Sequence, residues 1–363
     1  MYKIIRFLPL ICLIGLINAC KTAEKPGFIT HYKQEKHLKN IRQLTFGGDN
    51  AEAYWSFDNK NLVFQSNNKG WGLKCDQIFT MKAEQPTKTK GGAYPTPQML
   101  STGNGRTTCA YYMPDNKSII YASTHKYHTD CPAEAERTHG AYVWKLYPEF
   151  DIYQADLKGN IIKTLTNTTG YDAEATVSPD GKKIVFTSTR TGDPELFTMN
   201  LDGSEVKQVT FDLGYDGGAF FIPDSKQLVF RASRPTKPEE VEKYKALLAK
   251  DLVEPTSMEL FMVNIDGSDL RQITHLGGAN WAPFMHPSGK KILFSSNHHT
   301  KKGYPFNLFM INIDGTGLEQ ITFDTVFDSF PMFSPDGKKL IFGSNRNNGG
   351  SRDTNLFLAN WKD

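Results

Sequence analysis

The chain has 363 residues, of which 39% are hydrophobic and 22% are charged, and its formal net charge is +3. Two of the positive charges, Lys3 and Arg6, lie in an N-terminal segment that we expect to be removed, and their loss leaves +1. Because nucleic-acid binding needs a basic stripe, this near-neutral chain argues against a nucleic-acid partner. The abundance of Phe and Tyr, with Gly and Pro spread along the chain, favours a β-rich globular protein.

The N-terminal segment is typical of an export signal. The basic residues precede an apolar run, Phe7–Ile17, which is shorter than the ~20 residues of a membrane-spanning helix. The run ends in Asn18-Ala19-Cys20, which resembles the lipobox of bacterial lipoproteins, in which the cysteine is lipidated and becomes the mature N-terminus. An ordinary secretory signal is the alternative.

We therefore expect residues 1–19 to be a lipoprotein signal peptide and Cys20 to carry a lipid. Residues 20–40 are polar and rich in Lys and His, and they are expected to form a tether. Lys21 replaces the Asp that favours inner-membrane retention in enteric-type lipoproteins, so we expect an outer-membrane anchor in a bacterial cell envelope. Whether the body faces the periplasm or the exterior stays open.

One short segment recurs along the rest of the chain. Its best copies are Ser178–Arg190 and Ser334–Arg346, which share Ser-Pro-Asp-Gly-Lys-Lys, an apolar strand and a final Ser-x-Arg. Proline presets φ for a turn and Asp-Gly supplies positive φ, so each copy is predicted to be a β-hairpin. The six turns contain Phe57–Lys60, Pro114–Lys117, Pro179–Lys182, Pro223–Lys226, Pro287–Lys290 and Pro335–Lys338.

Each hairpin begins a unit of four predicted strands. In the third unit, the hairpin is followed by a third strand at Glu195–Phe197, a turn at Asp202-Gly203 and a fourth strand that ends in Val209-Thr210. Four strands per unit and a period near ~45 residues are typical of β-propeller blades. The sequence therefore predicts an all-β, six-bladed propeller of four-stranded antiparallel blades over residues 41–363.

The ends of the chain predict how the ring closes. The last unit stops soon after its third strand, Asn355–Phe357, and its fourth strand is missing there. A matching segment, Ile41–Thr45, stands at the start instead. We expect this N-terminal strand to complete the last blade and to remove two open sheet edges.

These hairpins, Ser-x-Arg endings and Asp-Gly-Ser turns resemble those of the TolB-like propellers, which are also called WD-repeat-like propellers. The resemblance spans Ile41–Trp361 and implies the same fold. The best-known member of the family works with the Tol envelope machinery and carries an additional N-terminal domain. Residues 1–40 are too short for that domain, so the resemblance implies a single-domain lipoprotein member rather than a Tol role.

Two columns of polar residues accompany the hairpins. Eight residues before each hairpin Asp, or Ser288 in the fifth copy, stand Asn50, Thr107, Asp172, Asp216, Asn280 and Asp328. Ten residues after it stand Asn68, His125, Arg190, Arg234, His298 and Arg346. Since one strand of a hairpin starts where its partner ends, both columns are expected to ring one face of the propeller.

Two interpretations of the columns stay open. The Asp and Arg residues can pair locally, or they can form a polar mouth for a ligand. Glu52 and Glu174 each stand two residues after a member of the first column, and we expect their carboxylates in the channel wall. The candidate ligand face comprises Glu52, His125, Asp172, Glu174, Arg190, Asp216, Arg234, His298, Asp328 and Arg346.

Two insertions are expected on the same face, at residues 126–149 of the second blade and 235–258 of the fourth. The second contains Pro238–Lys250, predicted to be an amphipathic helix with acidic residues first and a basic residue last. Forming a site and merely capping the channel are both open roles for the insertions. A Cys75–Cys131 disulfide is also expected near this face, with Cys109 as the competing partner.

Catalytic motifs are missing from the sequence: we find no G-x-S-x-G elbow, no phosphate-binding Walker loop and no H-E-x-x-H. We therefore expect no cofactor and no metal, and a non-catalytic propeller that binds an envelope protein or glycan partner at the insertion-bearing face. The alternative is a metal-assisted carbohydrate lyase or hydrolase, since oligogalacturonate lyases resemble this architecture and use a metal. His125, His298 and the channel carboxylates would be candidate ligands. A structural subunit of an envelope transport complex is the third possibility.

Overall fold

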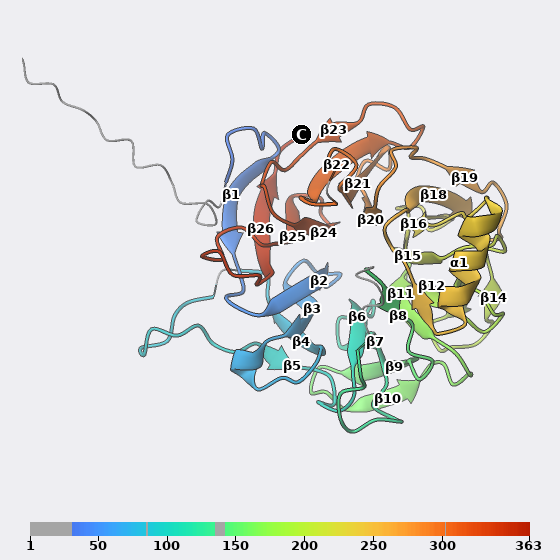
Figure 1. Cartoon of the computed structure of the whole chain (residues 1–363). Coiled ribbons are helices and arrows are strands. Elements are labelled where there is room, and N and C mark those ends of the chain that lie inside the picture. The colour runs from blue at the N-terminus through green and yellow to red at the C-terminus, as the bar shows by residue number, and fades with distance from the viewer. Residues whose placement is uncertain (1–30, 85, 135–141, 302) are drawn as a thin grey trace, which may run out of the picture.

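The computed structural model describes residues 31–84, 86–134, 142–301 and 303–363. The expected signal peptide and the lipidation candidate Cys20 lie outside these residues. Six four-stranded antiparallel sheets are arranged around a central axis, with one strand of each nearest the axis (Figure 1). This confirms the predicted six-bladed all-β propeller. No helix in the described part of the chain is both long and apolar enough to cross a membrane.

Strands follow one another from the axis outward in the first five blades. Blade one contains β2 (Asp49–Trp55), β3 (Asn61–Asn67), β4 (Gln77–Lys82) and β5 (Gln98–Met99). Blade two contains β6 (Thr107–Tyr112), β7 (Ser118–Ser123), β9 (Asp151–Asp156) and β10 (Ile161–Thr164). Blade three contains β11 (Asp172–Val177), β12 (Lys183–Ser188), β13 (Glu195–Asn200) and β14 (Lys207–Gln208).

The remaining blades keep this pattern until the last. Blade four contains β15 (Asp216–Phe221), β16 (Gln227–Ala232), β18 (Glu259–Asn264) and β19 (Arg271–Gln272). Blade five contains β20 (Asn280–Met285), β21 (Lys291–Ser296), β22 (Asn307–Asn312) and β23 (Glu319–Gln320). Blade six contains β24 (Asp328–Phe333), β25 (Lys339–Ser344), β26 (Asn355–Trp361) and, on its outer edge, the N-terminal β1 (Leu38–Gln43).

The repeated hairpin turn is held by its own side chains. In blade three the Ser178 hydroxyl donates to Asp180 at 2.6 Å and accepts from the Lys183 amide at 2.9 Å. Gly181 has φ of 68°, the left-handed conformation that glycine adopts without steric cost. These local contacts stabilise the turn in the two copies that contain the full Ser-Pro-Asp-Gly motif, and they account for its residues without any further chemistry.

The threonine after each fourth strand also has a structural task. In blade three the Thr210 hydroxyl accepts a hydrogen bond from the backbone amide of Leu196 in β13, at 2.9 Å. Hydroxyl groups accept from the third strand in the same way in all six blades. The six residues are Thr45, Ser101, Thr166, Thr210, Thr274 and Thr322. Because Thr45 performs this task for Leu356, the N-terminal segment completes the pattern of the sixth blade.

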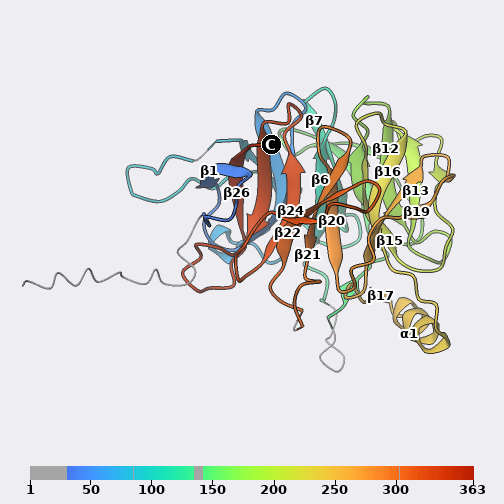
Figure 2. The same ribbon diagram turned by 90° about the horizontal axis from the view of Figure 1, so that it is seen from above.

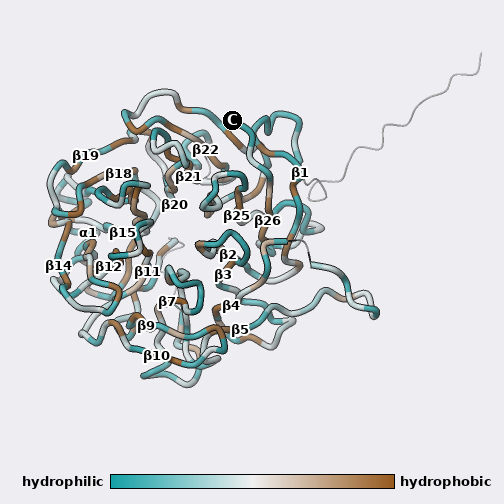
Figure 3. Tube along the Cα trace, turned by 180° about the vertical axis from the view of Figure 1, so that it is seen from behind, coloured by the Kyte–Doolittle hydropathy of each residue, from teal (hydrophilic) through white to brown (hydrophobic). Residues whose placement is uncertain are grey.

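Aromatic pairs form the centre of every blade, between its second and third strands. In blade three, for example, the ring centroids of Phe186 and Phe197 lie 5.9 Å apart. The other five pairs are Phe64–Phe79, Tyr121–Tyr153, Phe230–Phe261, Phe294–Phe309 and Phe342–Phe357. Figure 3 shows hydrophobic stretches running through the blades, with many of the connecting turns hydrophilic. Burial of these rings is the main source of cohesion within a blade.

Ring closure includes a buried ion pair as well as a strand pair. β1 pairs antiparallel with β26 and begins at Leu38, three residues before the strand that the sequence predicted. Ahead of it, Glu35 is fully buried and accepts from the Arg346 guanidinium at 2.9 and 3.2 Å. Glu35 thus binds the last blade and His37 bonds to Glu319 of blade five, while residues 20–30 of the expected tether lie outside the described residues.

The two predicted insertions meet each other. The helix expected at 238–250 is α1 (Pro238–Leu248), with Glu239 and Glu240 in its first turn and Lys245 in its last. After it, β17 (Leu252–Val253) pairs antiparallel with β8 (Trp144–Lys145) of the blade-two insertion. Figure 2 shows α1 and β17 at the same end of the propeller. The insertions therefore form one cover rather than two separate lids.

A disulfide ties this cover to the first blade. Cys75 precedes β4, Cys131 lies in the blade-two insertion, and the two are joined with their Cα atoms 5.8 Å apart. Cys109, the competing partner in the sequence, is a buried free thiol. The expected Cys75–Cys131 pairing is confirmed.

We predict that Arg346→Met lowers the free energy of unfolding by about 3–5 kcal/mol at pH 7, because it leaves buried carboxylates without their cation. Arg346 lies within ion-pair distance of Glu35, Asp324 and Asp328. Burial and the Asp328 charge already raise the pKa of Asp324. A carboxyl whose folded pKa is raised binds protons on folding, so the variant should regain stability between pH 7 and pH 5.

Urea unfolding at the two pH values checks this prediction, with Arg190→Met as the matched control. Arg190 has one carboxylate partner, Asp172, and its side chain is 18% exposed. The control should lose less stability. Equal losses in the two variants would contradict a special role for Arg346 in ring closure.

We also predict that reducing the Cys75–Cys131 disulfide destabilises the protein by about 4 kcal/mol, the chain-entropy value for a loop of this length. The cysteines are 56 residues apart. Urea midpoints with and without dithiothreitol measure the effect. The double variant Cys75→Ala/Cys131→Ala is the control and should not respond to reductant; a response there would assign the effect elsewhere.

Candidate functional site

A ring of six irregular positions lines the central channel. Every innermost strand carries a register shift after its second or third residue, and one residue there has a left-handed backbone. These positions, which we call the bulge ring, are Glu52, Cys109, Glu174, Gly218, Ala282 and Phe330. Each stands six residues before the hairpin Asp or its equivalent. A bulge re-aims side chains, and all six residues of the ring border the narrow part of the channel.

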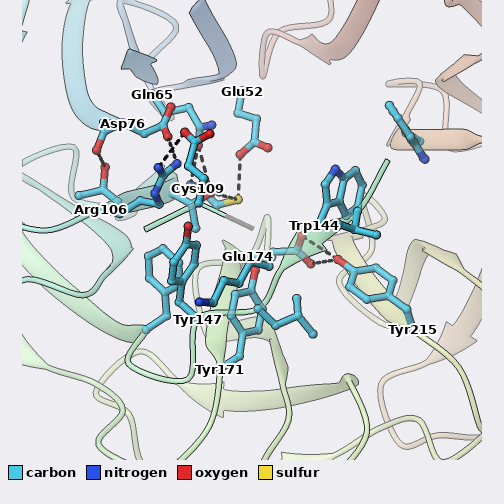
Figure 4. A pocket seen from close by; sticks show the side chains of 18 of the residues that line it. Glu52, Gln65, Asp76, Arg106, Cys109, Trp144, Tyr147, Tyr171, Glu174 and Tyr215 are labelled. Carbon is cyan, nitrogen blue, oxygen red and sulfur yellow. Dashed lines mark hydrogen bonds and ion pairs between the residues drawn. The ribbon is translucent and has the colours of Figure 1, made fainter. Parts of the chain in front are cut away.

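Above the bulge ring lies a pocket of about 490 Å³. Its walls combine residues of the inner strands with the blade-two insertion, whose Trp144, Tyr147 and Phe150 face the same cavity. Figure 4 shows Trp144, Tyr147, Tyr171 and Tyr215 gathered around this space, with Glu174 among them and Glu52 next to Cys109. The size is in the usual range of small-ligand sites, and the lining is mainly aromatic with a few charged groups.

Glu174 is the most heavily bonded carboxylate of the pocket. It accepts from the Arg231 guanidinium at 2.5 Å, from the Tyr215 hydroxyl at 2.7 and 2.8 Å, and from Thr187 and the Gly218 amide. Arg231 also stacks over the rings of Trp144 and Tyr215, at 5.0 and 5.5 Å. Glu174 and Arg231 therefore neutralise each other and support the aromatic wall.

Two glycines of β15 make room for this cluster. A Cβ atom on Gly217 would overlap the Tyr215 hydroxyl and the Glu174 carboxylate, and one on Gly218 would overlap the Arg231 guanidinium. Gly218 also has φ of 60°, which glycine tolerates best. The fourth blade thus contributes Arg231 to the channel only because its own bulge residue has no side chain.

Glu52 is in a different electrostatic position. Its Oε2 accepts from the Cys109 thiol at 2.8 Å, and it has no ion pair among the described residues. Burial raises the pKa of Glu52, the hydrogen bond from Cys109 lowers it, and the Glu174 charge raises it. The net result is a pKa of about 7. Burial together with Glu52 raises the pKa of the Cys109 thiol, so this sulfur stays protonated at neutral pH.

At the mouth, a second arginine is already engaged. Arg106 donates to Asp76 at 2.7 Å and to Glu134 at 3.2 Å, and its guanidinium lies over the Tyr147 ring. Burial raises the pKa of Asp76, and Arg106 counteracts that effect. The cation therefore holds the blade-two insertion against blade one and is not free to bind an anion.

Of the ten candidate ligand-face residues, only Glu52 and Glu174 line the pocket. The first column instead joins neighbouring blades: the Asp172 amide, for example, donates to the Phe150 carbonyl of blade two at 3.0 Å. The equivalent bond occurs at every blade boundary, from Asn50, Thr107, Asp172, Asp216, Asn280 and Asp328. The side chains of Asp172, Asp216 and Asp328 are fully buried.

The second column covers the aromatic pair of each blade. Arg190 pairs with Asp172 at 3.0 Å and lies over Phe186 and Phe197. The same arrangement occurs in the other two Asp–Arg pairs, Asp216 with Arg234 and Asp328 with Arg346. His125 packs on Tyr153 and His298 on Phe309. None of these eight side chains lines the pocket, and each is engaged between or within blades.

Sequence reasoning missed most of the pocket. The missed residues include Gln65, Asp76, Arg106, Cys109, Tyr171, Tyr215, Arg231, Trp281, Phe327 and Phe330. Many of these residues stand six or nine residues before the hairpin Asp, or seven residues after it. The residue type at these positions varies strongly among the six copies. Those columns were visible in the sequence, but only the bulge geometry shows that they face the channel.

The metal ligands suggested by the sequence are not brought together in the described residues. Within residues 31–84, 86–134, 142–301 and 303–363, no group of three or more His, Cys, Asp or Glu side chains is placed to hold a metal ion. The suggested ligands His125 and His298 stand in blades two and five and pack on different aromatic rings. We therefore derive no catalytic step through a metal.

Comparison with known proteins agrees with the fold. The TolB β-propeller domain model matches residues 141–247. A TolB of Agrobacterium tumefaciens is similar with a TM-score of 0.54 and 18% identity, covering 87% of this chain and 91% of that protein. TolB from Acinetobacter baumannii is similar with a TM-score of 0.53 and 18% identity, covering 85% of this chain and 65% of that protein.

An enzyme shares the fold as well. The oligogalacturonate lyase of Vibrio parahaemolyticus is similar with a TM-score of 0.50 and 13% identity, covering 92% of this chain and 96% of the lyase. At such identities the structural similarity concerns the fold alone. Residues 141–247 thus match the TolB β-propeller domain, and the six four-stranded blades of the whole chain share the fold of the TolB propellers.

Proposed function

We propose that the protein is a non-catalytic binding propeller of the bacterial envelope, which receives a segment of a protein partner in the central pocket. The observation that carries this proposal is the pocket itself. It is walled by aromatic side chains from several blades, covered by the two joined insertions, and closed below by the bulge ring. Such a site buries a few side chains of a ligand and excludes water from them.

The internal organisation of the pocket supports binding over catalysis. Two of its charged groups, Glu174 and Arg231, satisfy each other, and Arg106 is engaged by Asp76 and Glu134. Groups that are held in this way shape a cavity, whereas acid–base chemistry needs groups that can exchange protons with a substrate. The fold similarity to TolB proteins also supports a protein partner.

A glycan is the second candidate partner. Flat aromatic faces such as those of Trp144 and Trp281, whose ring centroids are 5.3 Å apart, are suited to stacking on sugar rings. The two candidate partners differ in what a covalent probe at the mouth of the pocket would capture.

Envelope localisation through a lipid on Cys20 is part of the proposal. It is supported by the basic, apolar and small-residue pattern of the first 20 residues and by the family resemblance. Outer-membrane attachment is proposed from Lys21.

We predict that a photo-crosslinking residue at Tyr142, which is 47% exposed beside the pocket, forms a discrete protein adduct in living cells. The same residue at Ile162, which is 56% exposed on the outer strand β10, is the matched control and should give none. Trp144→Ala should reduce the Tyr142 adduct several-fold because it removes part of the aromatic wall. Gel analysis of envelope fractions reads out the result.

An adduct at Ile162 alone would place the partner on the outer rim and contradict the proposal. A glycosidase-sensitive adduct at Tyr142 would instead identify a glycan partner.

We also predict that Cys20→Ala moves the protein from the outer-membrane fraction to the soluble periplasmic fraction. Loss of the acyl chains removes the membrane affinity that each buried methylene supplies, at about 0.8 kcal/mol. Sucrose-gradient fractionation and intact-mass spectrometry check this, with Cys12→Ala as the control that leaves localisation unchanged. An unlipidated wild-type N-terminus would contradict the anchor.

A further inference from the structure

Glu52 carries the only carboxylate of the pocket that lacks a cationic partner among the described residues. The acidic groups in the lining are Glu52, Asp76, Glu134 and Glu174, and the basic groups are Arg106, Lys145 and Arg231. Arg106 is bound to Asp76 and Glu134, and Arg231 is bound to Glu174. Lys145 lies over the Tyr147 ring at 5.1 Å. No ion pair of this set reaches Glu52.

The hydrogen bonds of Glu52 also leave it incomplete. Oε2 accepts from the Cys109 thiol, a weak donor, whereas Oε1 has no hydrogen bond to the described residues. Glu174, the equivalent residue of the third blade, accepts from four other residues. A carboxylate inside a protein is stabilised by donors and cations. The bulge ring thus presents one acid with both oxygens engaged, Glu174, and one with an oxygen open to the pocket, Glu52.

The surroundings of Glu52 suit a cation on an apolar stem. The pocket walls are aromatic, and their rings already hold one guanidinium, because Arg231 lies over Trp144 and Tyr215. Aromatic faces attract cations, and they do so more strongly where water is excluded. Lysine and arginine bring a methylene stem that packs on such walls and a charged end that reaches an acid at the base.

We propose that Glu52 is the anchor of a subsite for a basic side chain, lysine or arginine, of the protein partner. This inference rests on the proposed function and adds the chemistry of the recognised group. The ammonium or guanidinium donates to the free Oε1 of Glu52, while the stem packs between the aromatic walls and the Cys109 thiol keeps its bond to Oε2. Glu174 is not available for this role, because Arg231 and Tyr215 occupy it.

The subsite has a defined pH dependence. The charged and titratable groups that face Glu52 are Cys109, Glu174, Arg231 and Asp76, from four other chain segments. Burial raises the pKa of Glu52 to about 7, and a bound cation favours the ionised form. Binding near neutral pH should therefore release protons, and affinity for a cation should rise from pH 6 to pH 8.

The test uses blocked peptides as probes. Acetyl-Ala-Lys-Ala-amide is compared with the same peptide containing norleucine, which keeps the stem and lacks the charge, and with glucosamine. Tryptophan fluorescence and saturation-transfer NMR at pH 6 and pH 8 measure binding to the full chain. We expect the lysine peptide to bind at least tenfold more tightly than the norleucine peptide at pH 8, and less than threefold more tightly at pH 6.

Two variants make the test specific. Glu52→Gln should abolish the preference for lysine and its pH dependence. Glu205→Gln is the matched control, because Glu205 has a similar left-handed backbone, with φ of 55° against 51°, but lies exposed in a turn. It should behave as the wild type. Circular dichroism confirms that both variants are folded, and the wild-type pH profile is a readout that needs no variant.

Each outcome separates this inference from the proposed function. Equal binding of the two peptides, lost in Trp144→Ala, would overturn the basic subsite and leave the pocket as a binding site. Failure of the lysine peptide to bind would also overturn the subsite, while crosslinking from Tyr142 tests the pocket independently. Glucosamine binding more tightly than the lysine peptide, with the same dependence on Glu52, would overturn the protein partner in favour of an amino sugar.

Discussion

Closure of the ring is the constraint on which the rest of the structure depends. Four-stranded blades have exposed edges and cannot bury their faces alone, so they are stable only as a complete circle. The N-terminal β1 pairs with the C-terminal β26, and Glu35 adds a fully buried ion pair with Arg346 at that junction. The same backbone hydrogen bond links all six neighbouring blades, including the last to the first through Asn50 and Thr354. Closure holds the innermost strands rigidly around the channel.

Within that circle, one backbone irregularity decides which residues can meet a ligand. The bulge turns the residue six before the hairpin Asp toward the channel, whereas the residue eight before it lies buried at a blade boundary. Structural residues are therefore similar from blade to blade, because every blade solves the same packing problem. Bulge-ring residues differ, because a glutamate, a cysteine, a glycine and a phenylalanine all satisfy the same left-handed backbone.

The insertions turn this channel into a pocket. β8 and β17 pair across the mouth, Trp281 donates to the Pro255 carbonyl at 2.9 Å, and Tyr244 of α1 bonds to Asp193. A separate hydrophobic cluster contains Tyr147, Phe150 and Trp281 and joins the insertions to the blade tops. The described part of the cover is thus packed on the blade tops, and it supplies aromatic rings that the repeated units do not encode. This division of labour, with a rigid scaffold and variable loops, is how one fold hosts many binding functions.

The architecture of the propeller is predictable from the sequence alone. The Ser-Pro-Asp-Gly turns, the alternating apolar strands, the displaced N-terminal strand and α1 are local patterns, and local turn chemistry and hydrophobic periodicity are strong enough to be seen in one chain. The sequence also indicated Glu52 and Glu174 as channel residues and Cys75–Cys131 as a disulfide. Only the tertiary structure decided which columns face the channel, because a bulge shifts the two-residue alternation of a strand, and that shift has no signature in residue type. Asp172, Arg190, His125 and their equivalents looked like a binding face, yet packing placed them between and within blades. The sequence also could not show that Glu52 lacks an ion pair, because that follows from the tertiary contacts of Arg106 with Asp76 and Glu134 and of Arg231 with Glu174.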